Sequence, residues 1–178
     1  MKVITFLNYK GGISKTTLTR TFATKMAIDY GKKVLCLDLD ICRCNSFIRV
    51  SLRVHQKVKH VAEALVLYQP KARGQSAVFV EVQAQANKMM ADDTTGDQAG
   101  QLRDQLKKIE KDYDYVVIDC PAAETIAVRA AIVASKEVIV PCDANQDCID
   151  AVQRVKATVA EMKKYNPRVC VAGHNYFL

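Results

Sequence analysis

The sequence is poor in residues that interrupt regular structure, with 7 glycines and 4 prolines among 178 residues. Together with a hydrophobic content of 49%, this composition excludes a collagen-like or disordered chain and indicates a packed globule. No apolar run reaches the ~18 residues of a membrane helix, and the N-terminus lacks the order of basic, apolar and small residues that marks a secretory signal. We therefore expect a single cytoplasmic domain over residues 1–178, either short or truncated at its C-terminus.

The seven cysteines are an odd number, and none stands in a C-x-x-C spacing. Three lie inside apolar runs that predict buried strands, where a thiol behaves as a small hydrophobe. These are Cys36, Cys120 and Cys170. Cys42 with Cys44 and Cys142 with Cys148 form two close pairs, but no histidine stands at a metal-ligand interval beside either pair. The pattern favours reduced thiols over a disulfide framework or a metal site.

The net charge of +7 is concentrated in one segment. Between residues 49 and 73, six basic residues are accompanied by Glu63 alone. The six are Arg49, Arg53, Lys57, Lys59, Lys71 and Arg73. Such a segment can attract nucleic acid or an anionic membrane by releasing counterions. A solvated surface is the other interpretation, and charge alone favours it.

Short apolar runs alternate with segments of helical spacing along the chain. Strands are expected at 2–7, 32–40, 77–82, 115–119, 137–141 and 168–173, and helices at 15–30, 58–67, 101–111, 125–134 and 147–165. Residues 83–100 are expected to form a surface excursion. The alternation requires right-handed crossovers and a parallel sheet covered on both faces. The expected fold class is therefore α/β, doubly wound, with a mainly parallel sheet.

Apolar residues recur at helical spacing in two of the expected helices. In the first helix they are Leu18, Phe22 and Met26. In the last helix one face carries Ile149, Val152, Val155, Val159 and Met162.

The ligand crevice of an α/β protein lies at the carboxyl ends of its strands. The loop after the first strand reads Asn8-Tyr9-Lys10-Gly11-Gly12-Ile13-Ser14-Lys15-Thr16-Thr17. In a phosphate loop, glycines let backbone N–H groups surround the anion, a lysine reaches the outer phosphates and a hydroxyl binds Mg²⁺. Gly11, Gly12, Lys15 and Thr16 match these roles. The loop therefore predicts a nucleotide-phosphate site.

The loop departs from the strict G-x-x-x-x-G-K-[ST] pattern, since Tyr9 and Ser14 occupy the two outer glycine positions. A positive φ at position 14 would strain serine more than glycine. The extra lysine in K-G-G-x-x-K-T-T instead resembles the deviant Walker A motif of the ParA and MinD superfamily, a resemblance that covers most of the chain.

The resemblance implies a P-loop NTPase fold with ATP and Mg²⁺ as cofactors. The residues that it implies for ATP binding are Lys10, Gly11, Gly12, Ile13, Ser14, Lys15, Thr16 and Thr17. Lys10 would reach across a homodimer to the phosphates of the partner's ATP. One positive charge between two nucleotides would make dimerisation depend on ATP.

The second strand ends in Leu37-Asp38-Leu39-Asp40, which resembles the Walker A-prime motif of the same superfamily. The resemblance implies that Asp40 orients the attacking water, so that Lys10, Lys15 and Asp40 form the catalytic set. It implies that Asp38 helps to hold Mg²⁺ or the switch region. Many ParA proteins continue with Pro-Gln, whereas this chain continues with Ile41-Cys42.

The run from Tyr113 to Pro121 matches the superfamily's Walker B pattern, in which four apolar residues lead to an acid. Asp119 is thereby implied in Mg²⁺ binding through water, together with Thr16. A cap of the next helix is the alternative role for Asp119. After the last strand, Asn175 is a candidate for adenine recognition, and a turn residue that satisfies its own backbone is the equal alternative.

By resemblance, the chain is expected to be a slow partition ATPase of the ParA kind. It would form an ATP-dependent homodimer, bind DNA nonspecifically on the nucleoid and respond to a ParB-like centromere-binding partner. Three features of the sequence favour this ParA-like expectation. The chain starts directly at its first strand, ends without a basic amphipathic helix for membrane and has a basic charge balance.

Alternatives from other classes stay open beside this function. One is a MinD-like positioning ATPase, and another is a nucleotide-switched regulatory or scaffold dimer with negligible hydrolysis. An electron carrier with Cys42 or Cys44 at a dimer interface is a third.

Overall fold

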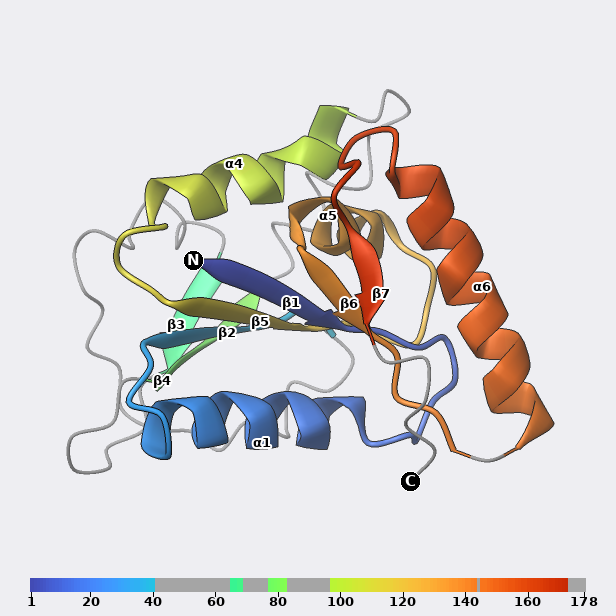
Figure 1. Cartoon of the computed structure of the whole chain (residues 1–178), viewed down its shortest axis with the longest axis horizontal. Helices are drawn as coiled ribbons and strands as arrows, with labels where there is room; N and C mark the ends of the chain where they lie inside the picture. Colours follow the sequence, from blue (N-terminus) through green and yellow to red (C-terminus); the bar gives the residue numbers. More distant parts are fainter. Residues whose placement is uncertain (41–64, 69–76, 83–96, 144, 173–178) are drawn as a thin grey trace.

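The computed structural model describes residues 1–40, 65–68, 77–82, 97–143 and 145–172 (Figure 1). The strands are β1 Lys2–Phe6, β2 Val34–Asp38, β3 Leu65–Tyr68, β4 Ala77–Val82, β5 Tyr115–Asp119, β6 Glu137–Ile139 and β7 Cys170–Ala172. The helices are α1 Lys15–Ile28, α4 Gln101–Lys108, α5 Ile126–Ala134 and α6 Gln146–Met162, with a short 3-10 turn at Asp97–Gly100 before α4.

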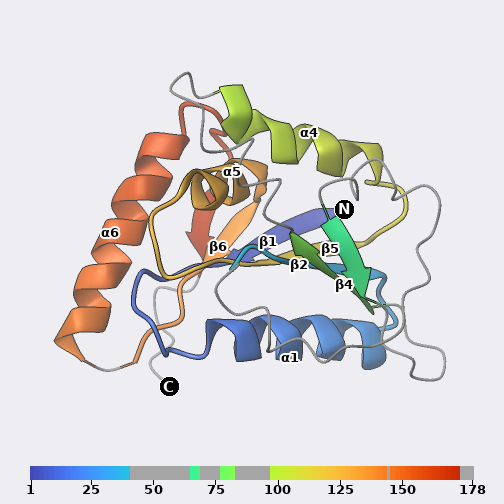
Figure 2. The ribbon, with the colours of Figure 1, turned by 180° about the vertical axis from the view of Figure 1, so that it is seen from behind.

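The strands form one sheet in the order β3-β4-β2-β5-β1-β6-β7. Every neighbouring pair is parallel except β3 with β4, which is antiparallel. Helix α1 covers one face, and α4 and α5 cover the other with α6 beside them, an arrangement seen from both sides in Figures 1 and 2. The predicted α/β fold with a mainly parallel sheet is confirmed.

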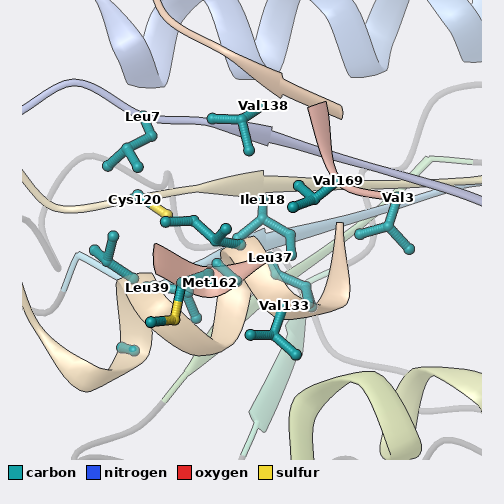
Figure 3. Packing of buried hydrophobic residues seen from close by; sticks show 14 of the residues in the cluster. Val3, Leu7, Leu37, Leu39, Ile118, Cys120, Val133, Val138, Met162 and Val169 are labelled. Atoms are coloured by element: carbon teal, nitrogen blue, oxygen red, sulfur yellow. The ribbon is translucent and has the colours of Figure 1, made fainter. Parts of the chain in front are cut away.

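Alternate residues of the central strands enter two different cores, which explains why their sequences are continuously apolar. Ile4, Phe6 and Val117 pack toward α1 with Ala23 and Ala27. The residues between them on the strands join the larger core with α4, α5 and α6. Figure 3 shows part of this larger core, in which Leu37 and Ile118 of the sheet lie with Val133 and Met162 of the helices.

Helix α1 packs on the sheet through a face that lies one residue along from its large apolar side chains. Thr19, Ala23 and Ala27 are buried, whereas Leu18, Phe22 and Met26 flank them and are partly buried. Small residues at the centre let the helix approach the sheet closely, and the long side chains fill the edges. The Phe22 ring, for example, packs on Phe6 at a centroid distance of 5.9 Å.

Two expectations about the elements and the core are wrong. The helix predicted at 58–67 is contradicted at its described end, because Leu65–Leu67 belong to β3. Cys170 is exposed because β7 is the last strand of the sheet. On the apolar face of α6, Ile149 is 40% exposed, since Cys148 and Ala151 occupy the buried positions in its place.

Other expectations lie outside the described residues, including those on Asn175, on Cys42 and Cys44, and on most of the basic segment 49–73. Within the described part of the chain, no helix has the length and apolar character needed to cross a membrane.

Candidate nucleotide site

The loop between β1 and α1 is anchored by a buried asparagine. Asn8 is 0% exposed, and its Nδ2 donates to the carbonyl of Pro141 at 2.7 Å. Its Oδ1 accepts a hydrogen bond from the backbone N–H of Lys10 at 2.9 Å. Sequence reasoning assigned no role to Asn8, although an asparagine at a strand end commonly binds the backbone two residues ahead. Asn8 therefore joins the start of the loop to the segment after β6.

Two residues of the loop adopt left-handed backbone conformations. Gly12 has φ +79°, and Ser14 has φ 60° and ψ 24°. Ser14 is the one non-glycine with positive φ in the described residues, and its side chain makes no capping hydrogen bond to α1. The strain expected for serine at this position is therefore present, and for a residue with a Cβ it amounts to about 1–2 kcal/mol.

The described residues leave the rim of the loop uncovered. A Cβ placed on Gly11 or Gly12 would meet no described atom within 4 Å. Both glycines are exposed, as is Thr17, and Ile13 is half-buried. The space over the two glycines can therefore accept an anionic group close to the backbone.

Lys15 lies on the inner side of the loop. It is 8% exposed, and its Nζ donates to the carbonyl of Lys10 at 3.2 Å. A nearly buried ammonium held at the first turn of a helix adds its charge to the positive end of the helix. The arrangement favours a polyanion on this side of the loop.

Asp119 at the end of β5 is a buried carboxylate whose hydrogen-bonding capacity is unsatisfied among the described residues. It is 1% exposed, and neither carboxylate oxygen has a hydrogen-bond partner among the described residues. Desolvation raises the pKa of Asp119, while the neighbouring Thr16 hydroxyl and the Lys15 charge lower it in part. Thr16 is thus close to the carboxylate without making a hydrogen bond of normal geometry to it. A buried oxygen pair beside a hydroxyl fits a hydrated magnesium ion.

Asp38 and Asp40 come to the same place from β2. Asp38 lies in register with Asp119 on the adjacent strand and is 4% exposed. Its Oδ1 accepts a hydrogen bond from the backbone N–H of Asp40 at 2.9 Å, and Asp40 is half-buried. The Asp40 charge also raises the pKa of Asp119. The predicted residues Lys15, Thr16 and Asp119 thus lie together with Asp38 at the end of β2 and with Asp40 just after it.

Lys10 points to a different part of the molecule. Its Nζ donates to Asn145 Oδ1 at 2.8 Å and lies 3.4 Å from Asp143 Oδ2, both in the connection from β6 to α6. Sequence reasoning missed Asp143 and Asn145. The available signal was the Asp-x-Asn sequence directly before a predicted helix, where such residues act as caps.

Comparisons with known proteins agree with this geometry. A family model described as an AAA domain matches residues 1–171. The chain is 25% identical to the septum site-determining protein MinD of Synechocystis, over 86% of this chain and 58% of that protein. It is 23% identical to the chromosome partitioning protein ParA of Myxococcus xanthus, over 97% of this chain and 63% of that protein.

The fold recurs in the crystal structure of cobyrinic acid a,c-diamide synthase from Mycobacterium smegmatis, which holds an ATP analogue and magnesium. The TM-score is 0.77, with 24% identity over 97% of this chain and 73% of the synthase. At that identity the similarity shows the fold alone. The match of the family model over nearly the whole chain, with the ParA and MinD relatives, shows more: the chain belongs to the AAA-domain family and is a P-loop NTPase of the ParA/MinD type.

Proposed function

We propose that the protein is an ATPase that binds ATP with Mg²⁺, dimerises on ATP and positions DNA. The observation that carries the proposal is the pairing of Lys15, turned into the loop, with the unsatisfied carboxylate of Asp119. A triphosphate would bind the ammonium, and a hydrated Mg²⁺ would satisfy the carboxylate. The carboxylate gains most from such a ligand, because an unsatisfied buried polar group costs about 1–3 kcal/mol.

Each side chain has a definite task in this proposal. The backbone N–H groups of the loop and Lys15 bind the β- and γ-phosphates, and Thr16 with Asp119 holds magnesium. Asp40 orients the water that attacks the γ-phosphate. The hydrogen bond from the Asp40 N–H to Asp38 gives Asp38 the task of positioning Asp40, since one of its oxygens is engaged there.

Dimerisation, DNA binding and a centromere-binding partner belong to the proposal and rest on the resemblance of the phosphate loop to the deviant Walker A motif. The Myxococcus ParA is named for chromosome partitioning, and the net charge of +7 suits a polyanionic partner. Association with the nucleoid would follow from nonspecific DNA binding.

The test of DNA binding uses random duplex DNA with ATP and Mg²⁺, with ADP, and without nucleotide, over a salt series. We expect DNA binding only in the presence of ATP and Mg²⁺. This binding should weaken steeply as salt rises, because phosphate contacts release counterions. Lys15→Ala is the matched control and is expected to show no response to ATP. Equal binding in all three nucleotide states would contradict an ATP-switched DNA-binding protein.

A MinD-like positioning ATPase is the second candidate, because the Synechocystis MinD is a relative at 25% identity. It predicts ATP-dependent binding to anionic lipid vesicles in place of DNA.

A regulatory dimer with negligible hydrolysis is distinguished from the partition and MinD-like ATPases by its rate of single-turnover ATP hydrolysis. Asp40→Ala should slow hydrolysis about 100-fold if Asp40 assists the attacking water, whereas equal rates for both proteins would remove Asp40 from catalysis.

A further inference from the structure

The segment that leads into α6 forms a preorganised acceptor for the Lys10 ammonium. Asn145 Oδ1 accepts from Lys10 Nζ at 2.8 Å, and the two Asp143 carboxylate oxygens lie 3.5 and 3.4 Å from the same nitrogen. Asn145 Nδ2 donates to Asp143 Oδ2 at 2.7 Å, which fixes the two acceptors relative to each other. Lys10 therefore contacts a carboxylate and an amide oxygen that are held in place by a hydrogen bond between their own side chains.

The acceptor pair is tied to the phosphate loop by Asn8. The Asn8 side chain binds the Pro141 carbonyl at 2.7 Å, approaches Cys148 Sγ at 3.4 Å and accepts from the Lys10 N–H at 2.9 Å. One buried side chain thus fixes both the backbone of Lys10 and the segment that carries its acceptors. The β1–α1 loop and the entry to α6 run side by side as a result (Figure 1).

Asn145 has a second task as the N-cap of α6. Its Oδ1 accepts from the backbone N–H of Cys148 at 3.0 Å, so one oxygen serves both the helix and Lys10. The Lys10 charge, after the Cys148 thiol, also lowers the pKa of Asp143, which keeps the carboxylate ionised opposite the ammonium. The position of Lys10 is therefore coupled to the first turn of α6.

We propose that Asp143 and Asn145 form a cis latch that holds Lys10 within its own subunit, and that the ATP dimer forms only when Lys10 leaves this pair. The inference rests on the proposed function and on the role that the resemblance implies for Lys10, which would bind the triphosphate held by a second copy of the chain. A triphosphate carries more negative charge than one carboxylate and an amide, so it wins the competition once both copies hold ATP. The latch raises the protein concentration at which dimers form and disfavours dimers without ATP.

The size of the effect follows from the exposure of the pair. An exposed ion pair changes an equilibrium by about 1.5- to 5-fold, and two lysines are released per dimer. Removal of the latch should therefore tighten the ATP dimer by about 2- to 25-fold.

Asp143→Ala tests the latch through the dimer dissociation constant, measured by sedimentation with the slowly hydrolysed analogue AMP-PNP and Mg²⁺. Asp147→Ala is the matched control, since Asp147 is exposed in the first turn of α6 and carries the same charge. We expect Asp143→Ala to tighten the dimer and Asp147→Ala to leave its dissociation constant within about 1.5-fold of the wild type. Equal tightening by both variants, or by neither, would overturn the latch.

Asn145→Ser is an independent test, because serine is also a good N-cap but is too short to replace the amide at Lys10. It should tighten the AMP-PNP dimer while the melting temperature of the nucleotide-free protein stays unchanged. Tightening only in proportion to a change in melting temperature would indicate a structural effect and contradict the latch.

The same experiment separates the latch from the proposed function. Dimerisation of the wild type with AMP-PNP and no change in either variant contradicts the latch alone. Monomers in every protein, including both latch variants, contradict ATP-dependent dimerisation and the latch with it. A wild type that stays monomeric while Asp143→Ala dimerises would support both.

Discussion

The two sides of the phosphate loop differ in how their charges are satisfied. On the inner side, Lys15 is nearly buried beside Asp119, whose carboxylate oxygens have no hydrogen-bond partner in the described residues. On the outer side, Lys10 is satisfied by Asp143 and Asn145, which also bind each other. The inner side thus holds an unsatisfied carboxylate, whereas on the outer side the chain itself supplies acceptors for the lysine.

The difference indicates the order in which the two sides can act. A cation on the inner side removes an existing desolvation penalty at Asp119, and a phosphate there competes with one hydrogen bond, from Lys15 Nζ to the Lys10 carbonyl. A ligand for Lys10 must first displace two acceptors that belong to the chain itself. We therefore expect nucleotide binding to a monomer to precede any intersubunit contact of Lys10.

The largest expected effect is a difference in nucleotide affinity between the Lys15→Ala and Lys10→Ala variants. Lys15→Ala should weaken the binding of a fluorescent ATP analogue to the monomer by about 100-fold, because a charge-assisted contact to phosphate is lost in a poorly solvated place. Lys10→Ala should leave monomer binding within about threefold of the wild type and weaken the ATP dimer instead, since its side chain binds Asp143 and Asn145 outside the inner side of the loop. Titration at protein concentrations below dimerisation measures the first effect, and sedimentation measures the second.

The comparison fails if both lysine variants lose nucleotide binding equally. That result would place Lys10 in the inner site when ATP is bound. Melting curves without nucleotide serve as the control for folding, because both alanines must leave the fold intact for the binding constants to be compared.

The next largest expected effect is a change in the free energy of unfolding caused by Asp119→Asn. Burial raises the pKa of Asp119 above its ordinary value of 3.8. The contribution of this group to stability is therefore fully present below pH 3.8 and is lost as the pH rises through the folded-state pKa. The variant, which cannot ionise, should raise the free energy of unfolding at pH 7 by about 1–3 kcal/mol and less as the pH falls.

Denaturation at several pH values without nucleotide measures this difference. The same variant should lose the added stability that ATP with Mg²⁺ gives to the wild type, because it lacks a charge for the cation. A destabilised Asp119→Asn protein at pH 7 would mean that the carboxylate is satisfied by groups outside the described residues.

Much of the fold followed from sequence because parallel strands covered on both faces are continuously apolar, as in β2 and β5. The inner site followed for a related reason: carboxylates at adjacent strand ends, such as Asp38 and Asp119, must meet at one edge of the sheet. Periodicity alone gave the wrong element at Leu65–Leu67, since a short apolar run suits either a helix or a strand.

The latch residues could not be predicted in the same way. Asp143 and Asn145 follow a strand on the far side of β1, and polar residues before a helix usually act as simple caps. Only the folded positions show that Asn145 Oδ1 serves Lys10 as well as the Cys148 N–H. Spacing likewise could not show that Cys148 and Ala151, rather than Ile149, occupy the buried face of α6.

The smallest expected effect concerns the strain stored between the two sides of the loop. Ser14 holds φ 60° at the start of α1, and its side chain does not cap the helix. Ser14→Gly should raise the free energy of unfolding by about 0.5–1 kcal/mol, because relief of the left-handed strain exceeds the entropy that glycine adds to the unfolded chain. Urea denaturation of the nucleotide-free protein measures the change, and Gly12→Ser at φ +79° is the opposite control, expected to destabilise. A Ser14→Gly protein less stable than the wild type would mean that the hydroxyl, rather than the backbone, decides the conformation of this loop.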